Sequence, residues 1–209
     1  MKWFTDGLSE EQLAVLRTVG PLASSRQYYL GGGTALAIYL NHRRSLDLDW
    51  FTPDQLVDPM LFAQSLRDAE IEFETEQTAP GTLHGQVQGV KVSFLEFRYP
   101  LLSPLVTWPE TEINFASLDD LGCMKLSAIA QRGAKKDFYD VYMLCTQHQP
   151  LERLLELYQQ KFSVTDIGPV LYGLVYFDDA DEEPDPVLLS PIEWTQVKLA
   201  FRSWVKLIR

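Results

Sequence analysis

Residues 28–51 read YYLGGGTALAIYLNHRRSLDLDWF, and this stretch decides the fold. A short apolar run, Tyr28 to Leu30, enters three consecutive glycines, and a helical pattern follows as far as His42. Glycines let backbone amides approach a phosphate closely at a helix N-terminus. Asp47 and Asp49 are one residue apart, so on a strand both point to one face and can share a hard divalent cation. The stretch therefore predicts a strand, a phosphate loop, a helix and an acidic strand.

The composition is that of a globular protein in a reducing compartment. The 209 residues are enough for one domain with a helical extension. No apolar stretch is long enough to span a bilayer, and the N-terminus lacks the apolar segment of a signal peptide. Cys123 and Cys145 have no metal-type spacing. We therefore expect a cytoplasmic protein without a membrane partner.

The net charge of −11 argues against nonspecific coating of nucleic acid, because such binding depends on Lys and Arg that neutralise phosphates. Basic residues nevertheless cluster at residues 42–44, at residues 132–136 and in the last helix. A local basic patch thus remains compatible with the sequence.

The patterns along the chain predict an α+β fold, with an α/β core over residues 1–116 and a helical part over residues 117–209. Trp50 and Phe51 are expected in the core rather than as a platform for a base. Helices are predicted at residues 9–19, 34–42, 55–69, 117–132, 136–145, 151–162, 165–177 and 191–209. Strands are predicted at residues 28–30, 47–51, 71–75, 86–88 and 90–97, with a connection at 100–114 and an acidic loop at 178–186.

Glu96 is a candidate third acid for a metal site. In the strand around it, Val92, Phe94 and Glu96 share one face, so a carboxylate interrupts an otherwise apolar surface. The competing interpretation is a solvated surface acid.

The helix at residues 117–132 and the one after it carry further candidates. Lys125 and Arg132 lie near one face of the first helix, and Asp137 and Asp140 are neighbours on the second. The alternatives are a solvated basic helix face for Lys125 and Arg132, and acids that complement the helix dipole for Asp137 and Asp140.

The glycines and the Asp47–Asp49 pair together identify a family more specifically than either motif alone. A strand, Gly32-Gly33, thirteen intervening residues and Asp47-Leu48-Asp49 resemble the signature of the nucleotidyltransferase fold related to DNA polymerase β. Residues 32–51 resemble the first motif of the AbiEii/AbiGii toxin family, and residues 125–144, KLSAIAQRGAKKDFYDVYML, resemble its downstream pattern. The two motifs occur in the expected order and cover about two-thirds of the chain.

This resemblance implies a mixed sheet flanked by helices, followed by a helical C-terminal part. It implies transfer of a nucleotide from an NTP to an acceptor hydroxyl with Mg²⁺ or Mn²⁺. Some relatives act on the tRNA acceptor end, so an RNA such as tRNA is the expected acceptor. The family includes toxins of abortive-infection and type IV toxin–antitoxin systems, which implies an antitoxin encoded nearby.

The resemblance also assigns roles to individual residues. Asp47 and Asp49 are the expected metal pair, with Glu96 as a possible third ligand. Lys125 is expected near the triphosphate and Asp140 as the later catalytic acid, with Asp137 as its competitor. The expected nucleotide-binding residues are Gly31, Gly32, Gly33, Thr34, Arg132 and Asp137. Glycine stands where many relatives have serine, which removes a hydroxyl contact and keeps the backbone amides.

Two other functions remain open from the sequence. The enzyme could modify a protein side chain, which the acidic net charge favours, whereas the basic clusters favour RNA. The fold could also bind an NTP without catalysis and act through a protein partner, although the intact Asp47 and Asp49 argue against this.

Overall fold

A mixed seven-stranded sheet forms the first half of the chain in the computed structural model, which describes residues 2–208. The strand order is β3-β4-β5-β2-β1-β7-β6. The β2–β5 and β1–β7 pairs are parallel and the other neighbours are antiparallel. The strands are β1 (Tyr29–Leu30), β2 (Leu48–Thr52), β3 (Phe73–Ala79), β4 (Thr82–Val87), β5 (Val90–Glu96), β6 (Val106–Trp108) and β7 (Ile113–Phe115).

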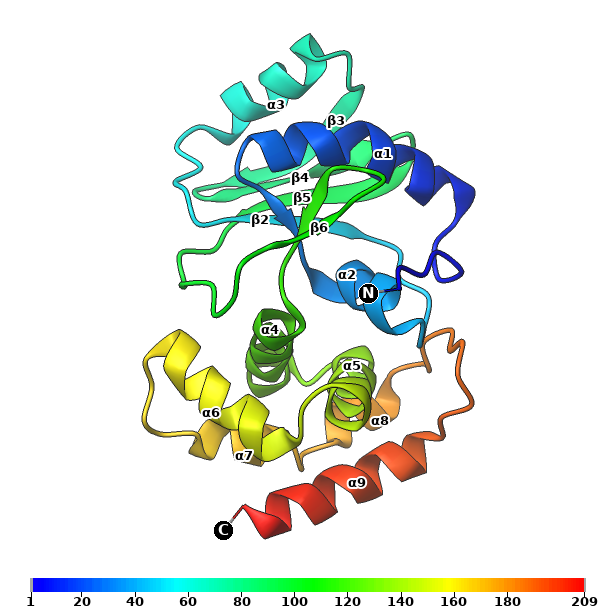
Figure 1. Ribbon diagram of the computed structural model, residues 1–209, viewed down its shortest axis with the longest axis vertical. Coiled ribbons are helices and arrows are strands. Elements are labelled where there is room, and N and C mark those ends of the chain that lie inside the picture. Colours follow the sequence, from blue (N-terminus) through cyan, green and yellow to red (C-terminus); the bar gives the residue numbers. More distant parts are fainter. Residues whose placement is uncertain (1, 209) are drawn as a thin grey trace.

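Alternation along β2 separates the core face of the sheet from the site face. Leu48 and Trp50 are completely buried, and Trp50 lies against α1 (Glu10–Ser25) close to Gly20. Asp49 points the opposite way, because successive side chains of a strand alternate. Figure 1 shows α1 and α3 (Pro59–Asp68) over the core face, while α2 (Gly32–Leu40) leads towards the later helices.

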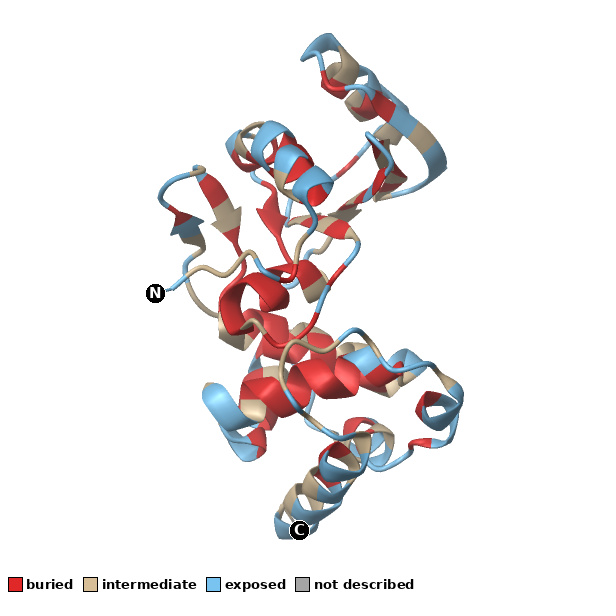
Figure 2. Cartoon of the chain, turned by 90° about the vertical axis from the view of Figure 1, so that its right-hand side faces the viewer, coloured by how far each residue is buried: buried red, intermediate tan, exposed pale blue. Residues whose placement is uncertain are grey.

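The second half of the chain is helical and packs against α2. Its first helix, α4, begins after Ser117, whose hydroxyl accepts a bond from the Asp120 N–H, and ends at Gly133 in the left-handed conformation. Buried residues concentrate along α2, α4 and α5, where the two halves meet (Figure 2). These helices are α4 (Leu118–Arg132), α5 (Lys135–Gln147), α6 (Leu151–Phe162), α7 (Gly168–Gly173), α8 (Asp178–Glu182) and α9 (Trp194–Leu207). Within residues 2–208, no helix combines the length and apolar character needed to cross a membrane.

The mixed sheet and the helical second half confirm the predicted fold class, but several boundaries differ. The supposed connection at residues 100–114 contains β6 and most of β7, three-residue strands too short for a periodic pattern. The helix predicted from residue 55 begins at Pro59, because Asp58 rather than Asp54 caps it. The acidic loop contains the short helix α8, and the helix predicted at residues 165–177 is reduced to α7.

Candidate active site

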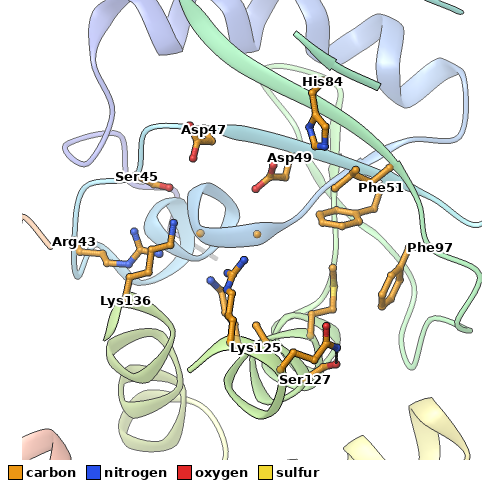
Figure 3. Close-up of a pocket in the computed structure, with 17 residues that line it drawn as sticks. Arg43, Ser45, Asp47, Asp49, Phe51, His84, Phe97, Lys125, Ser127 and Lys136 are labelled. Atoms are coloured by element: carbon orange, nitrogen blue, oxygen red, sulfur yellow. Dashed lines mark hydrogen bonds between the residues drawn. The ribbon is translucent and has the colours of Figure 1, made fainter. Parts of the chain in front are cut away.

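A cavity of about 650 Å³ lies between the site face of the sheet and the first helices of the second half (Figure 3). The sheet half contributes the glycine loop and the residues around β2, and α4 and α5 contribute basic and polar side chains. Its charged lining residues are Arg43, Asp47, Asp49, Lys125, Arg132 and Lys136.

Every second residue from 43 to 51 lines this cavity. Arg43, Ser45, Asp47, Asp49 and Phe51 all contribute to the wall, although only the last two lie within β2. An extended chain sends alternate side chains to the same side. The segment before β2 is therefore part of the site.

Asp47 and Asp49 are partly buried neighbours on this wall. Burial raises the pKa of Asp49, and the charge of Asp47 raises it further, while Lys125, a hydrogen bond from Ser93 and Lys136 act in the opposite direction. Two carboxylates that repel each other in a partly desolvated site are stabilised by a cation between them.

Gly32 and Gly33 are required because the loop backbone passes close to the side chains of Asp49 and Arg43. Gly32 has a φ of +63°, and a Cβ there would lie 2.6 Å from Asp49 Oδ2. A Cβ on Gly33 would lie 2.5 Å from Arg43 Nη2. Both positions therefore keep backbone close to a carboxylate and a guanidinium, at the N-terminus of α2 where first-turn N–H groups lack helical partners.

Gly31 and Thr34, the two outer residues of the predicted phosphate loop, make hydrogen bonds within the protein. The Gly31 N–H donates to the Asp49 carbonyl at 2.9 Å. The Thr34 hydroxyl donates to the Asp47 carbonyl, and Thr34 is buried. Neither residue lines the cavity, so the expectation that their polar groups contact a nucleotide is corrected: they hold the acidic segment against the loop.

Lys125 is held in place by two buried acids. Its Nζ lies 2.7 Å from Asp137 Oδ1 and 2.6 Å from Asp140 Oδ2. Burial alone would lower the pKa of Lys125, but Asp140 and Asp137 outweigh burial and raise it. Since an ammonium has three donors, one remains for the cavity that Lys125 lines. The residue is 6% exposed, so the interpretation of Lys125 as part of a solvated helix face is wrong.

Arg43 is held by the same acid from the other side. Its Nε and Nη2 donate to the two oxygens of Asp140 at 2.7 and 2.8 Å, and His42 Nε2 lies 2.7 Å from Oδ1. Burial would raise the pKa of Asp140, but Arg43, Lys125 and His42 together hold it well below its usual range. From the sequence, Arg43 was placed only within a basic cluster. Its spacing of four residues from Asp47 could have indicated that both side chains point to the same side of an extended chain.

Asp137 and Asp140 are completely buried and do not line the cavity. Asp137 binds Arg132 as well as Lys125, with Arg132 Nε 2.9 Å from Oδ2. Asp140, expected as the later catalytic acid, and Asp137, expected as its competitor and as a nucleotide-binding residue, thus lie behind the cations Arg43, Lys125 and Arg132 and not at the cavity wall. Arg132 and Lys136 are exposed at the cavity wall.

Glu96 lies on the wrong face for the metal pair. The parallel register pairs Asp49 with Ser93 and Thr52 with Glu96, so Glu96 points to the same side as the buried Thr52. Its carboxylate accepts a bond from the Leu56 N–H at 3.0 Å and pairs with Arg98. Glu96 therefore cannot join Asp47 and Asp49.

Aromatic side chains form the other end of the cavity. Phe51 and Phe97 both line it, with ring centroids 5.8 Å apart. Trp50 is in the core as predicted, but the same prediction for Phe51 is wrong in part, because one side of its ring faces the cavity. A planar base would find apolar surface here.

The pair Asp47 and Asp49 fits Mg²⁺ or Mn²⁺. Both supply hard oxygen donors, and a bound cation would offset the burial and the neighbouring Asp47 charge that together raise the pKa of Asp49. No cluster of three or more acidic, His or Cys side chains that could hold a metal occurs among residues 2–208. Two carboxylates are sufficient for Mg²⁺, which usually keeps waters and substrate phosphates as its other ligands.

Solved structures of nucleotidyltransferases share this fold. A putative nucleotidyltransferase from H. pylori is 16% identical and covers 96% of each chain, with a TM-score of 0.59. MenT4, a nucleotidyltransferase toxin from Mycobacterium tuberculosis, is 16% identical over 93% of this chain and 82% of its own, with a TM-score of 0.60. At these identities the likeness concerns the fold.

The chain belongs to the family described as "Nucleotidyl transferase AbiEii toxin, Type IV TA system", whose profile matches residues 15–204. An uncharacterized protein from Aquifex aeolicus is 37% identical over 203 residues, which is 95% of this chain and 96% of the relative. The family resemblance of the two sequence motifs is thereby confirmed, as is the assignment to the nucleotidyltransferase enzymes.

Proposed function

We propose that this protein transfers a nucleotide from an NTP to a hydroxyl of RNA, such as the 3′ end of a tRNA, in a Mg²⁺-dependent reaction. The observation that carries the proposal is that one cavity brings together the Asp47–Asp49 pair and the cations Arg43, Lys125 and Lys136. A metal-bound triphosphate presents both charges that this arrangement complements.

The reaction joins the acceptor oxygen to the α-phosphorus and breaks the bond from that phosphorus to the oxygen that bridges to the β-phosphorus. Pyrophosphate leaves, and the hydroxyl proton passes to water. Asp47 and Asp49 would hold the metal, which supplies Lewis-acid stabilisation of phosphate charge when bound.

The chain's own cations and amides account for the remainder of phosphate binding. The first-turn amides at Gly32 and Gly33 face phosphate oxygens. Lys125 offers its third N–H. The cations Arg43, Lys125, Arg132 and Lys136 outnumber the acids Asp137 and Asp140 behind them by two, which leaves a net positive charge for phosphate.

A protein side chain is the second candidate acceptor, and one observation favours it. The edge strand β3 exposes Glu76 in a cavity that Asp47 and Asp49 also line, and Glu72 and Glu74 are exposed further along the same edge, so RNA phosphates would be repelled there. An RNA acceptor would have to approach past Arg132 and Lys136 instead.

The test is incubation with each α-labelled NTP, Mg²⁺, total RNA and cellular protein, followed by separation of the RNA from the protein. We expect label in RNA, and we expect Asp47→Asn and Asp49→Asn each to lower the rate by at least about 10²- to 10³-fold, as loss of a key electrostatic group does. Asp54→Asn, a change of an exposed acid beyond the end of β2, is the matched control. Transfer at the wild-type rate by either site variant would sink the assignment, and label only in protein would replace the acceptor class.

Membership of a toxin–antitoxin family supports a protein antitoxin as partner. Inspection of the neighbouring reading frames is the direct check. Co-expression of a neighbouring gene that restores growth of cells producing this protein would support the pairing, and growth inhibition that no neighbour relieves would contradict it.

A further inference from the structure

A second cavity, of about 340 Å³, adjoins the nucleotide cavity at the metal pair. The two cavities share three lining residues, Asp47, Asp49 and His84. A group-transfer enzyme needs space for two substrates that meet at the reacting atoms. The second cavity provides that space on the side away from Lys125, which lines only the first.

His84 stands at the junction because of strand register. The antiparallel β4–β5 register pairs His84 with Ser93, and the parallel β2–β5 register pairs Ser93 with Asp49. Paired residues point to the same face of a sheet, so these three side chains form a row across three strands. Figure 3 shows the His84 ring projecting towards Asp49 and Phe51.

The contact with Ser93 engages one nitrogen of the His84 ring. His84 Nδ1 lies 2.9 Å from Ser93 Oγ. In the tautomer in which Nδ1 donates to Ser93 Oγ, Nε2 carries the free lone pair and is an acceptor. Within residues 2–208, the hydrogen bond of the His84 ring is this one through Nδ1.

We propose that His84 Nε2 accepts a hydrogen bond from the acceptor hydroxyl and so aligns its oxygen with the α-phosphorus. The inference rests on the proposed function and adds an acceptor-binding residue to it. Among the other charged groups of the second cavity, Asp47 and Asp49 are assigned to the metal and Lys91 is a donor only. Glu76 accepts a bond from Gln86 at the outer edge of the sheet, whereas His84 lies at the junction with the first cavity.

Substitution of His84 by Asn or by Gln tests the contributions of its two ring nitrogens separately. The Asn side chain in His84→Asn places its amide near the position of Nδ1, so it can keep the bond to Ser93 and removes the group at Nε2. The longer side chain in His84→Gln reaches the position of Nε2. We expect His84→Asn to lower kcat/KM for the acceptor about tenfold, which corresponds to one good hydrogen bond, and His84→Gln to stay within about threefold of wild type.

The assay uses bulk tRNA as the acceptor probe and the NTP that the wild type transfers, with NTP affinity measured separately by calorimetry without tRNA. Loss of transfer in His84→Asn with unchanged NTP affinity, and rescue in His84→Gln, supports the inference. Equal transfer by His84→Asn and wild type overturns the inference alone. Loss of NTP affinity, or a larger loss in His84→Gln than in His84→Asn, assigns His84 a merely structural role and also overturns it. Absence of label on tRNA with the wild type overturns the RNA acceptor and this inference together.

Discussion

At Asp49 the proposed role in metal binding opposes stability. Its carboxylate is partly buried beside Asp47, and burial together with that neighbouring charge raises its pKa. A group whose pKa is higher in the folded state than in the unfolded chain contributes stability below the unfolded pKa, about 3.9, and this stability is lost as the pH rises through the folded pKa. At neutral pH the ionised Asp49 therefore lowers the free energy of unfolding.

Asp49→Asn should consequently abolish transfer and yet stabilise the protein at pH 7. We expect a gain on the order of 1 kcal/mol, or about 2–4 °C in Tm, and a smaller gain as the pH approaches 4. Thermal melting without NTP or Mg²⁺ measures the effect, with Asp54→Asn as a control that should change little. A lower Tm of Asp49→Asn than of wild type at pH 7 would show that the ionised Asp49 carboxylate does not destabilise the folded protein.

At the scale of elements, α5 joins both walls of the site. Asp137 and Asp140 lie one turn apart on α5 and bind Lys125 of α4, while Asp140 also binds Arg43 from the segment before β2. Buried ion pairs of this kind add little when complete, but removal of one partner leaves uncompensated charge in the interior. The cluster therefore fixes the relative position of three segments that are distant in sequence.

Asp140→Asn should destabilise the fold by about 3–5 kcal/mol, because Arg43 and Lys125 lose their shared counter-charge. Urea unfolding at pH 7 measures this, and Asp179→Asn on the surface of α8 is the control, expected to stay within about 0.5 kcal/mol.

The pH dependence of Asp140 has the opposite sign to that of Asp49. The pKa of Asp140 is depressed in the folded state, so its contribution is present above the unfolded pKa and is lost as the pH falls through the folded pKa. The difference between wild type and Asp140→Asn should therefore shrink only in acid, below about pH 4. A variant as stable as wild type at pH 7 would rule out the proposed role of the cluster.

The whole molecule places one half of the site on the sheet and the other on the helices. Asp47 and Asp49 come from the sheet half, and Lys125, Arg132 and Lys136 come from α4 and α5. A ligand that contacts both halves stabilises each of them against local opening.

Addition of Mg²⁺ and the transferred NTP should thus slow amide hydrogen exchange in β2 and in α4 together. Helix α9, which does not line the cavity, should show no local protection and serves as the internal reference. Protection confined to one half would mean that the nucleotide does not bridge the cavity.

The local patterns of the sequence were sufficient for the elements nearest the chemistry. The glycine loop and the Asp47–Asp49 pair depend on neighbouring residues, and the caps of α4, Ser117 and Gly133, lie directly at its two ends. Such signals act over a few residues, so they remain legible without the fold.

Relations between strands and helices were decided only by the tertiary structure. Strand register placed Ser93 rather than Glu96 beside Asp49, and brought His84 next to Ser93. Packing of α5 buried Asp140 against Arg43, 97 positions away. By itself, the sequence determined which residues are candidates for binding a metal and phosphates, because candidacy depends on residue type and local spacing. Which of them meet was set by sheet order and helix packing, since these bring together residues whose separation along the chain carries no periodic signal.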